Sequence, residues 1–145
     1  MLKGIDARVT PALMDVLMRM GHGDEIAVVD SNYPAFSLET VTGRVVDLPG
    51  LNLPEALALI LKLMPLDGFT DHAALWMQRD GAGETPDPVH REVIAAITPN
   101  LPTGGRLRSI ERQAFYAHAA GSFAVIRCTE TRPFGCAILR MGVVF

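Results

Sequence analysis

Cysteine is scarce in this chain of 145 residues, and its scarcity excludes two common ways of building a small domain. The two cysteines, Cys128 and Cys136, form no CxxC pair and have no closely spaced histidines. They therefore predict neither a disulfide framework nor a cysteine-ligated zinc site. A chain of this kind fits a reducing compartment, and we expect it in the cytoplasm. The four histidines are also dispersed, so spacing predicts no metal site and no cofactor (His22, His72, His90 and His118).

Basic charge and long apolar runs are missing as well. The formal net charge is −3 and the Lys and Arg residues are scattered, which argues against nucleic acid as a partner. The longest apolar stretch, residues 53–66, contains Glu55 and Lys62 and is shorter than the ~20 residues that a bilayer helix needs. The first ten residues, MLKGIDARVT, have no continuous apolar segment of the kind found in signal peptides. We therefore expect neither membrane insertion nor secretion.

Apolar residues, by contrast, are abundant. They make up 49% of the chain, and the length suits one domain, residues 1–145, whose core would bury roughly 68 to 70% of the unfolded surface. The mean hydropathy of +0.24 is high for a small monomer. Such a composition indicates that part of the apolar surface is covered by further copies of the chain, so we expect a homo-oligomer.

Helical and strand patterns alternate along most of the sequence. Helices are predicted at 11–20, 53–64, 88–97 and 111–120, and strands at 25–29, 43–48, 73–78, 106–110, 123–129 and 135–141. This alternation predicts an α/β protein with three layers, α/β/α, around a central mixed and mostly parallel sheet. The last two strands are expected to be antiparallel neighbours.

The stretch RMGHGDEIAVVD, residues 19–30, places one histidine between two glycines. Gly21 and Gly23 remove neighbouring Cβ atoms and permit unusual backbone angles, which would present the His22 imidazole rather than pack it. The third glycine of a dinucleotide loop is absent, and the segment joins a helix to a strand in the reverse of the nucleotide-binding order, so no nucleotide site is predicted. A solvated turn histidine is the simpler alternative for His22.

Asp30 ends the apolar run that follows. Ligands of open α/β sheets bind at the carboxyl ends of strands, which makes Asp30 a candidate for substrate binding in combination with His22. The alternative is a carboxylate that only starts the turn before Pro34. Asp24 and Glu25 are expected to solvate the preceding turn, although Asp24 could also orient the imidazole.

Arg112 and Tyr116 occupy one face of the helix predicted at 111–120. A guanidinium and a phenol on one face could contact a polar ligand. The alternative is a surface arginine beside a half-buried tyrosine.

Several of these stretches together resemble the RbsD/FucU family of sugar mutarotases, and within it the branch that acts on L-fucose. The matching segments are MGHGDEI (20–26), SNYPA after Asp30, the stretch ending in Asp67, IER with FY shortly after (110–116), FAVI (123–126) and FGCAILRMGV (134–143). The likeness spans nearly the whole chain. It implies a ring-shaped homo-oligomer, usually a decamer, with sugar sites between adjacent subunits.

The resemblance also implies roles for individual residues. His22 would be the catalytic proton donor, and Asp30 and Arg112 would contact the sugar. A third contact, Tyr-Gly-Asn in the family, falls here on Phe134, Gly135 and Cys136. A phenol and a carboxamide are thus replaced by a phenyl ring and a thiol, which is a weak hydrogen-bond donor.

The predicted activity is interconversion of the α and β anomers of a free monosaccharide, with L-fucose favoured over D-ribose. Histidine's ordinary pKa of about 6.5 suits a group that gives and takes protons near neutrality, and the reaction needs no cofactor. Tyr116 and Phe134 could cover the apolar face of a deoxy sugar. Two alternatives stay open: a monosaccharide-binding protein without catalysis, accessory to sugar uptake or sensing, and an epimerase acting on another sugar or sugar acid.

Overall fold

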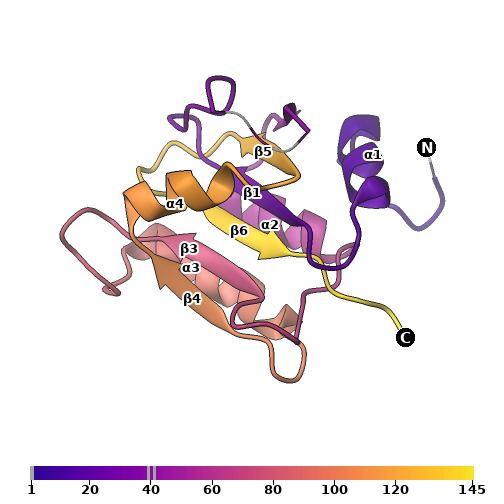
Figure 1. The fold of residues 1–145 in the computed structure, drawn as a ribbon. Coiled ribbons are helices and arrows are strands. Elements are labelled where there is room, and N and C mark those ends of the chain that lie inside the picture. Colours follow the sequence, from indigo (N-terminus) through magenta and orange to yellow (C-terminus); the bar gives the residue numbers. More distant parts are fainter. Residues whose placement is uncertain (1, 39, 41) are drawn as a thin grey trace.

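The computed structural model describes residues 2–38, 40 and 42–145, and these form a mixed sheet flanked by helices (Figure 1). The helices are α1 (Pro11–Arg19), α2 (Leu53–Leu61), α3 (Pro88–Ile97), the short 3₁₀ helix η1 (Thr98–Asn100) and α4 (Arg112–Ala119). The strands are β1 (Glu25–Val29), β2 (Arg44–Leu48), β3 (Ala74–Met77), β4 (Leu107–Ile110), β5 (Ala124–Cys128) and β6 (Ala137–Arg140).

The described strands form one sheet in the order β2-β5-β1-β6-β3-β4. β6 runs antiparallel to both of its neighbours, β1 and β3, while the other pairings are parallel. The predicted mixed, mostly parallel sheet is confirmed. The expectation that the last two strands are neighbours is wrong, because β1 lies between β5 and β6. Every residue of β1 is buried, and this central position gives it a hydrogen-bonded strand on each side.

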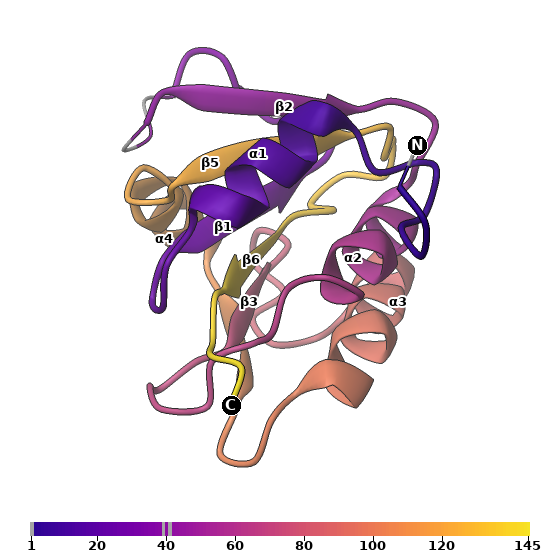
Figure 2. The same ribbon diagram turned by 90° about the vertical axis from the view of Figure 1, so that its right-hand side faces the viewer.

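Two apolar cores lie on the two faces of the sheet, and β1 contributes alternate residues to them. Ile26 and Val28 join the core built with α1, α2 and α3, whereas Ala27 and Val29 join the core beneath α4. Figure 2 shows α2 and α3 on one side of the sheet and α4 on the other. This arrangement confirms the three-layer architecture.

Local signals set most helix starts where the sequence predicts them. The Thr10 hydroxyl accepts a hydrogen bond from the Leu13 N–H at the start of α1. Asn52 and Glu55 form the reciprocal capping box of α2. α2 ends at Leu61, before the predicted residue 64. In the turn that follows, the backbone N–H groups of Leu63 and Met64 both donate to the carbonyl oxygen of Ile60. The predicted loop after α3 begins with η1.

Within the described part of the chain, no helix combines the length and the apolar character that a membrane span requires.

Candidate active site

A small cavity of about 150 Å³ lies at the carboxyl end of β1. Its walls include the turn after β1, the end of β3, the first turns of α4 and the loop before β6. Of the residues predicted to bind a ligand, five line it: Asp30, Arg112, Tyr116, Phe134 and Cys136. The structure therefore brings together residues separated by up to 106 positions in the numbering, at the end of the sheet where α/β proteins bind ligands.

Asp30 is 4% exposed, and its Oδ1 accepts hydrogen bonds of 2.9 Å from the backbone N–H groups of Asn32 and Tyr33. The carboxylate starts the turn before Pro34, as the simpler interpretation predicts, and it also lines the cavity. Burial raises the pKa of Asp30, although the backbone N–H groups of Asn32 and Tyr33 act in the opposite direction. The result is a preorganised acceptor for hydroxyl groups.

Arg112 is the first residue of α4 and is held by a partner that the sequence did not reveal. Its Nε lies 2.9 and 3.1 Å from the two carboxylate oxygens of Asp80, which follows β3. The guanidinium carbon is 5.8 Å from the centre of the Tyr116 ring. The hydrogen bond from Arg112 lowers the pKa of Asp80, so this pair stays charged at neutral pH. Both predicted residues of this helix face thus lie at the cavity.

The segment Phe134–Gly135–Cys136 forms a tightly packed wall. Phe134 has a φ of 62°, and its carbonyl oxygen lies 3.1 Å from Nε2 of the buried His90. A Cβ on Gly135 would come within 2.7 Å of the Glu130 side chain, so only glycine fits there. Burial raises the pKa of the Cys136 thiol well above its usual value, and this group therefore stays neutral next to Asp30.

His22 lies at the other end of β1, and its side chain is 48% exposed. Gly23 has a φ of 89°, a backbone conformation that favours glycine, as expected for a residue that helps to present the imidazole. Gly21 has no positive φ, and a Cβ there would meet nothing closer than 3.9 Å. The glycine frame is therefore needed on one side of His22 only.

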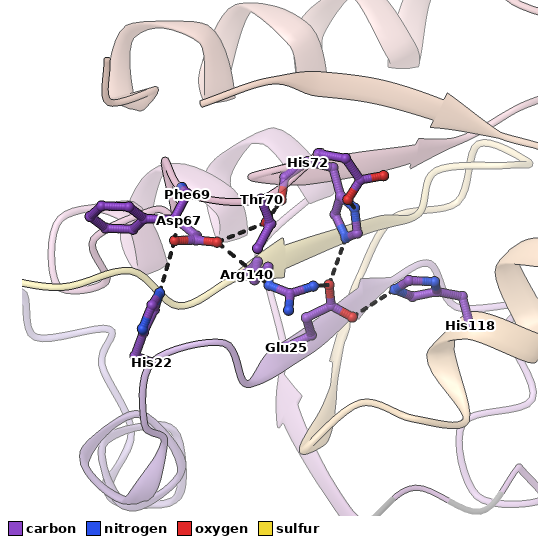
Figure 3. Close-up of polar contacts among 9 residues, drawn as sticks. His22, Glu25, Asp67, Phe69, Thr70, His72, His118 and Arg140 are labelled. Atoms are coloured by element: carbon purple, nitrogen blue, oxygen red, sulfur yellow. Dashed lines mark hydrogen bonds and ion pairs between the residues drawn. The ribbon is translucent and has the colours of Figure 1, made fainter. Parts of the chain in front are cut away.

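The partner of His22 is Asp67 rather than Asp24. Nε2 of His22 lies 3.0 Å from Oδ1 of Asp67 (Figure 3). The Asp24 carboxylate instead accepts a hydrogen bond from the backbone N–H of Gly21. Asp67 is fully buried and also accepts hydrogen bonds from the Thr70 hydroxyl and the Phe69 N–H.

Burial by itself would raise the pKa of Asp67, but the hydrogen bonds from Thr70 and His22 outweigh it, and the net pKa is lowered. A buried, ionised carboxylate fixes both the orientation and the tautomer of the imidazole. No sequence spacing links His22 with Asp67, and the one available signal was that Asp67 ends a stretch resembling the family.

His22 and Asp30 do not meet within one chain. They flank β1, whose five residues span about 16 Å at the usual rise per residue. A monosaccharide cannot bridge that distance. The expected combination of these two residues in one site therefore requires two copies of the chain.

The expectation that Glu25 solvates the turn after His22 is wrong. Glu25 is 9% exposed, because it begins the central strand on the face covered by α4. Its carboxylate oxygens lie 2.7 Å from Nε2 of His72 and 2.7 Å from Nε2 of His118 (Figure 3). These histidines lie 47 and 93 residues away in the sequence, so spacing could not predict the cluster.

The fold and these side chains define a class of protein: an α/β protein with a small cavity at the carboxyl end of its central strand and an imidazole held by a buried carboxylate. Comparison with known proteins makes the assignment specific. Residues 3–144 match the RbsD / FucU transport protein family. The chain belongs to the RbsD/FucU family.

Individual relatives agree with this assignment. A human protein named fucose mutarotase is 38% identical over 99% of this chain and 94% of its own. The fucose mutarotase of Streptococcus pneumoniae, solved in complex with L-fucose, is 32% identical with a TM-score of 0.87, covering 99% of this chain and 100% of that one. Bacillus subtilis RbsD, solved with D-ribose, is 19% identical over 100% of both chains with a TM-score of 0.77, and shows the shared fold.

Proposed function

We propose that this protein is a monosaccharide mutarotase that interconverts the α and β anomers of a free sugar, with L-fucose as the favoured substrate. The observation that carries the proposal is the half-exposed His22 imidazole held by the buried Asp67 carboxylate. Relatives named fucose mutarotase, similar over nearly their full length, support the choice of reaction and of sugar.

Anomer exchange requires opening and closing of the pyranose ring. A proton must reach the ring oxygen while another leaves the anomeric hydroxyl, after which the ring closes on the opposite face of the carbonyl. His22 can perform these transfers in turn, because an imidazole both donates and accepts protons near neutral pH. Acid and base catalysis of this kind contributes about 10²- to 10⁴-fold. The reaction involves no net oxidation or reduction.

The cavity residues bind and orient the sugar. The buried Asp30 carboxylate accepts hydrogen bonds from sugar hydroxyls, and Arg112 donates to a hydroxyl or to the ring oxygen. The rings of Tyr116 and Phe134 offer apolar surface to the methyl group of a deoxy sugar. Cys136 and Gly135 complete the wall beside Asp30.

The active site is proposed to form between subunits of a homo-oligomer, with His22 from one chain and the Asp30 cavity from its neighbour. The cavity of about 150 Å³ is smaller than the roughly 300 to 1,000 Å³ of typical ligand sites, so a second chain is needed to enclose the sugar. The Phe69 ring is 67% exposed and lies in a T-shaped arrangement with the His22 ring, with the ring centroids 5.6 Å apart. Its exposed surface offers an apolar contact to such a neighbour. The proposed assembly is a decamer, as the family resemblance implies, and its expected compartment is the cytoplasm, as the low cysteine content indicates.

NMR exchange spectroscopy on equilibrated L-fucose, with D-ribose alongside, tests the activity. The protein should accelerate exchange between the anomer signals, more for L-fucose than for D-ribose, and His22→Ala should remove the acceleration. Absence of acceleration with either sugar contradicts the proposal.

Mixing two inactive variants tests where the site is built. His22→Ala and Asp30→Asn chains are dissociated together and reassembled at equal concentration. Sites that combine an intact His22 with an intact Asp30 then restore about a quarter of the wild-type rate, because a heterologous interface pairs the two chain types at random. Light scattering must show that the mixture reassembles, and an assembled mixture without activity overturns the shared site.

A monosaccharide-binding protein without catalysis is the second candidate. The observation that favours it is the replacement of the family's Tyr-Gly-Asn by Phe134, Gly135 and Cys136, which removes two strong hydrogen-bonding groups from the cavity wall. Line broadening of the sugar signals without faster anomer exchange would support this alternative.

A further inference from the structure

We propose that Glu25, His72 and His118 form a binding site for a divalent transition-metal ion of the Zn²⁺ type. The possible ligand atoms, one from each residue, lie within 4.8 Å of one another. Two imidazole nitrogens and one carboxylate oxygen form one of the ligand sets that Zn²⁺ takes in sites with three protein ligands. The site is separate from the proposed sugar cavity and goes beyond the mutarotase function.

Each ligand comes from a different, well-fixed part of the fold. Glu25 begins the central strand β1, His72 precedes β3, and His118 lies in the last turn of α4 (Figure 3). The side chains of Glu25 and His72 are 10% and 8% exposed, whereas that of His118 is 31% exposed. The pair of buried ligands supplies rigidity, and the more exposed His118 marks the side from which an ion and a water ligand can enter.

The hydrogen bond on the far side of His72 supports metal ligation. Its Nδ1 lies 3.1 Å from the carboxylate of Asp71, which is 72% exposed. A carboxylate at Nδ1 holds the proton on that nitrogen and directs the lone pair of Nε2 toward the metal, as in many zinc sites. Nε2 is the atom that faces Glu25.

The surrounding charge favours a cation. Arg140 Nη1 lies 3.3 Å from Glu25 and opposes a positive ion, but Arg140 Nε is also 3.6 Å from Asp67, which offers the guanidinium a second partner. Glu25 and Asp67 thus place two carboxylates beside one guanidinium. Asp71 adds a third negative charge to the cluster at Nδ1 of His72. Metal binding would replace the two Glu25–histidine hydrogen bonds and release the protons that the Nε2 atoms carry in them.

Titration of metal-stripped full-length protein with ZnCl₂ tests this site. Isothermal titration calorimetry should give saturable binding of one Zn²⁺ per chain, and proton release should make the observed enthalpy depend on the ionisation enthalpy of the buffer. Co²⁺ used as a second probe should give the visible absorption bands of a site with nitrogen and oxygen ligands. His118→Ala and Glu25→Gln should each weaken Zn²⁺ binding by far more than tenfold, and Asp71→Asn by about tenfold.

His22→Ala is the matched control, because it removes an exposed imidazole outside the cluster and should leave the Zn²⁺ affinity unchanged. His118 is on the surface, so its variant is expected to keep the wild-type circular dichroism and assembly size even where a Glu25 variant does not fold. Binding that is unsaturable, or that persists at wild-type affinity in His118→Ala, overturns the proposal. Loss of anomer exchange would not affect this test, since its readout is metal binding.

Discussion

Asp67 and His22 are 45 residues apart in the sequence, yet the carboxylate of the first lies 3.0 Å from Nε2 of the second. Asp67 is fully buried and His22 is half exposed, so a carboxylate in the protein interior holds an imidazole at the surface. Such a pair holds an imidazole in one orientation while leaving its other nitrogen available to a substrate.

Replacement of His22 by alanine is predicted to reduce the acceleration of anomer exchange by about 10²- to 10⁴-fold, the range of acid and base catalysis. Stability should change little, because the side chain is 48% exposed and the buried Asp67 keeps its hydrogen bonds from Thr70 and Phe69. NMR exchange spectroscopy and thermal unfolding measure the two effects. A large drop in melting temperature would show that the residue has a structural role instead.

Asp67→Asn is predicted to slow anomer exchange by roughly tenfold or more, since the neutral amide no longer stabilises a protonated imidazole. It should also destabilise the fold by about 1 to 3 kcal/mol, because buried hydrogen bonds to a charged acceptor are lost. Chemical denaturation and exchange spectroscopy check both values. Asp24→Asn is the control, and equal effects of the two substitutions would contradict the assigned role of Asp67.

Arg112→Ala is predicted to weaken sugar binding by about tenfold or more, the loss of a charge-assisted hydrogen bond. Asp80→Asn should have a smaller effect in the same direction, because Asp80 positions the guanidinium without lining the cavity. Calorimetric titration with L-fucose compares them. Unchanged affinity in Arg112→Ala would remove that residue from the site.

Phe134→Tyr is predicted to strengthen binding of L-fucose by up to about tenfold, the value of one added hydrogen bond. The substitution restores the phenol that the family resemblance implies and keeps the aromatic ring. Titration with L-fucose and D-ribose measures the gain, and Phe36→Tyr, on a ring that is 69% exposed and does not line the cavity, is the control. An unaltered affinity would mean that the sugar does not approach this ring.

Stability is predicted to fall in acid partly through Glu130. Burial by itself raises the pKa of this carboxyl, but hydrogen bonds from Arg132 and from the Leu53 N–H lower it from 4.5 to about 2. A lowered pKa in the folded state stabilises the protein above pH 4.5, and this contribution is lost as the pH falls toward 2. We expect Glu130→Gln to cost about 2 kcal/mol at pH 7 and to flatten the acid side of the profile.

Glu92→Gln provides the comparison for that experiment. Glu92 also pairs with Arg132, but it is 50% exposed, and exposed ion pairs contribute about 0 to 1 kcal/mol. Denaturation between pH 3 and 7 separates the two variants. Equal losses for both would show that burial of Glu130 does not matter.

Local patterns predict the elements of this fold well because each depends on neighbours in the chain. The four apolar residues of β1 and the capping box at Asn52 are examples, and both lie where the sequence places them. Periodicity places Asp30 at a strand end and Arg112 on a helix face, whereas their roles as sugar contacts are what the family resemblance implies.

Contacts between distant segments could not be predicted in this way. Asp67 lies beside His22, and Glu25 beside His72 and His118, because the order of strands in the sheet brings them together. Glu25 also shows that an acid next to a turn need not be solvated. Its burial depends on α4, which is formed almost a hundred residues later in the chain, and no property of residues 19–30 specifies it.

The length of β1 determines how a defective chain affects the normal chains assembled with it. Because this strand keeps His22 and Asp30 apart, each chain of the proposed assembly contributes to two different sites, one at each end of β1. A chain that carries damage at both ends therefore disables a site with each of its two neighbours. A cell that produces such a chain beside the normal one would lose more activity than the share of defective copies, which makes the defect partly dominant.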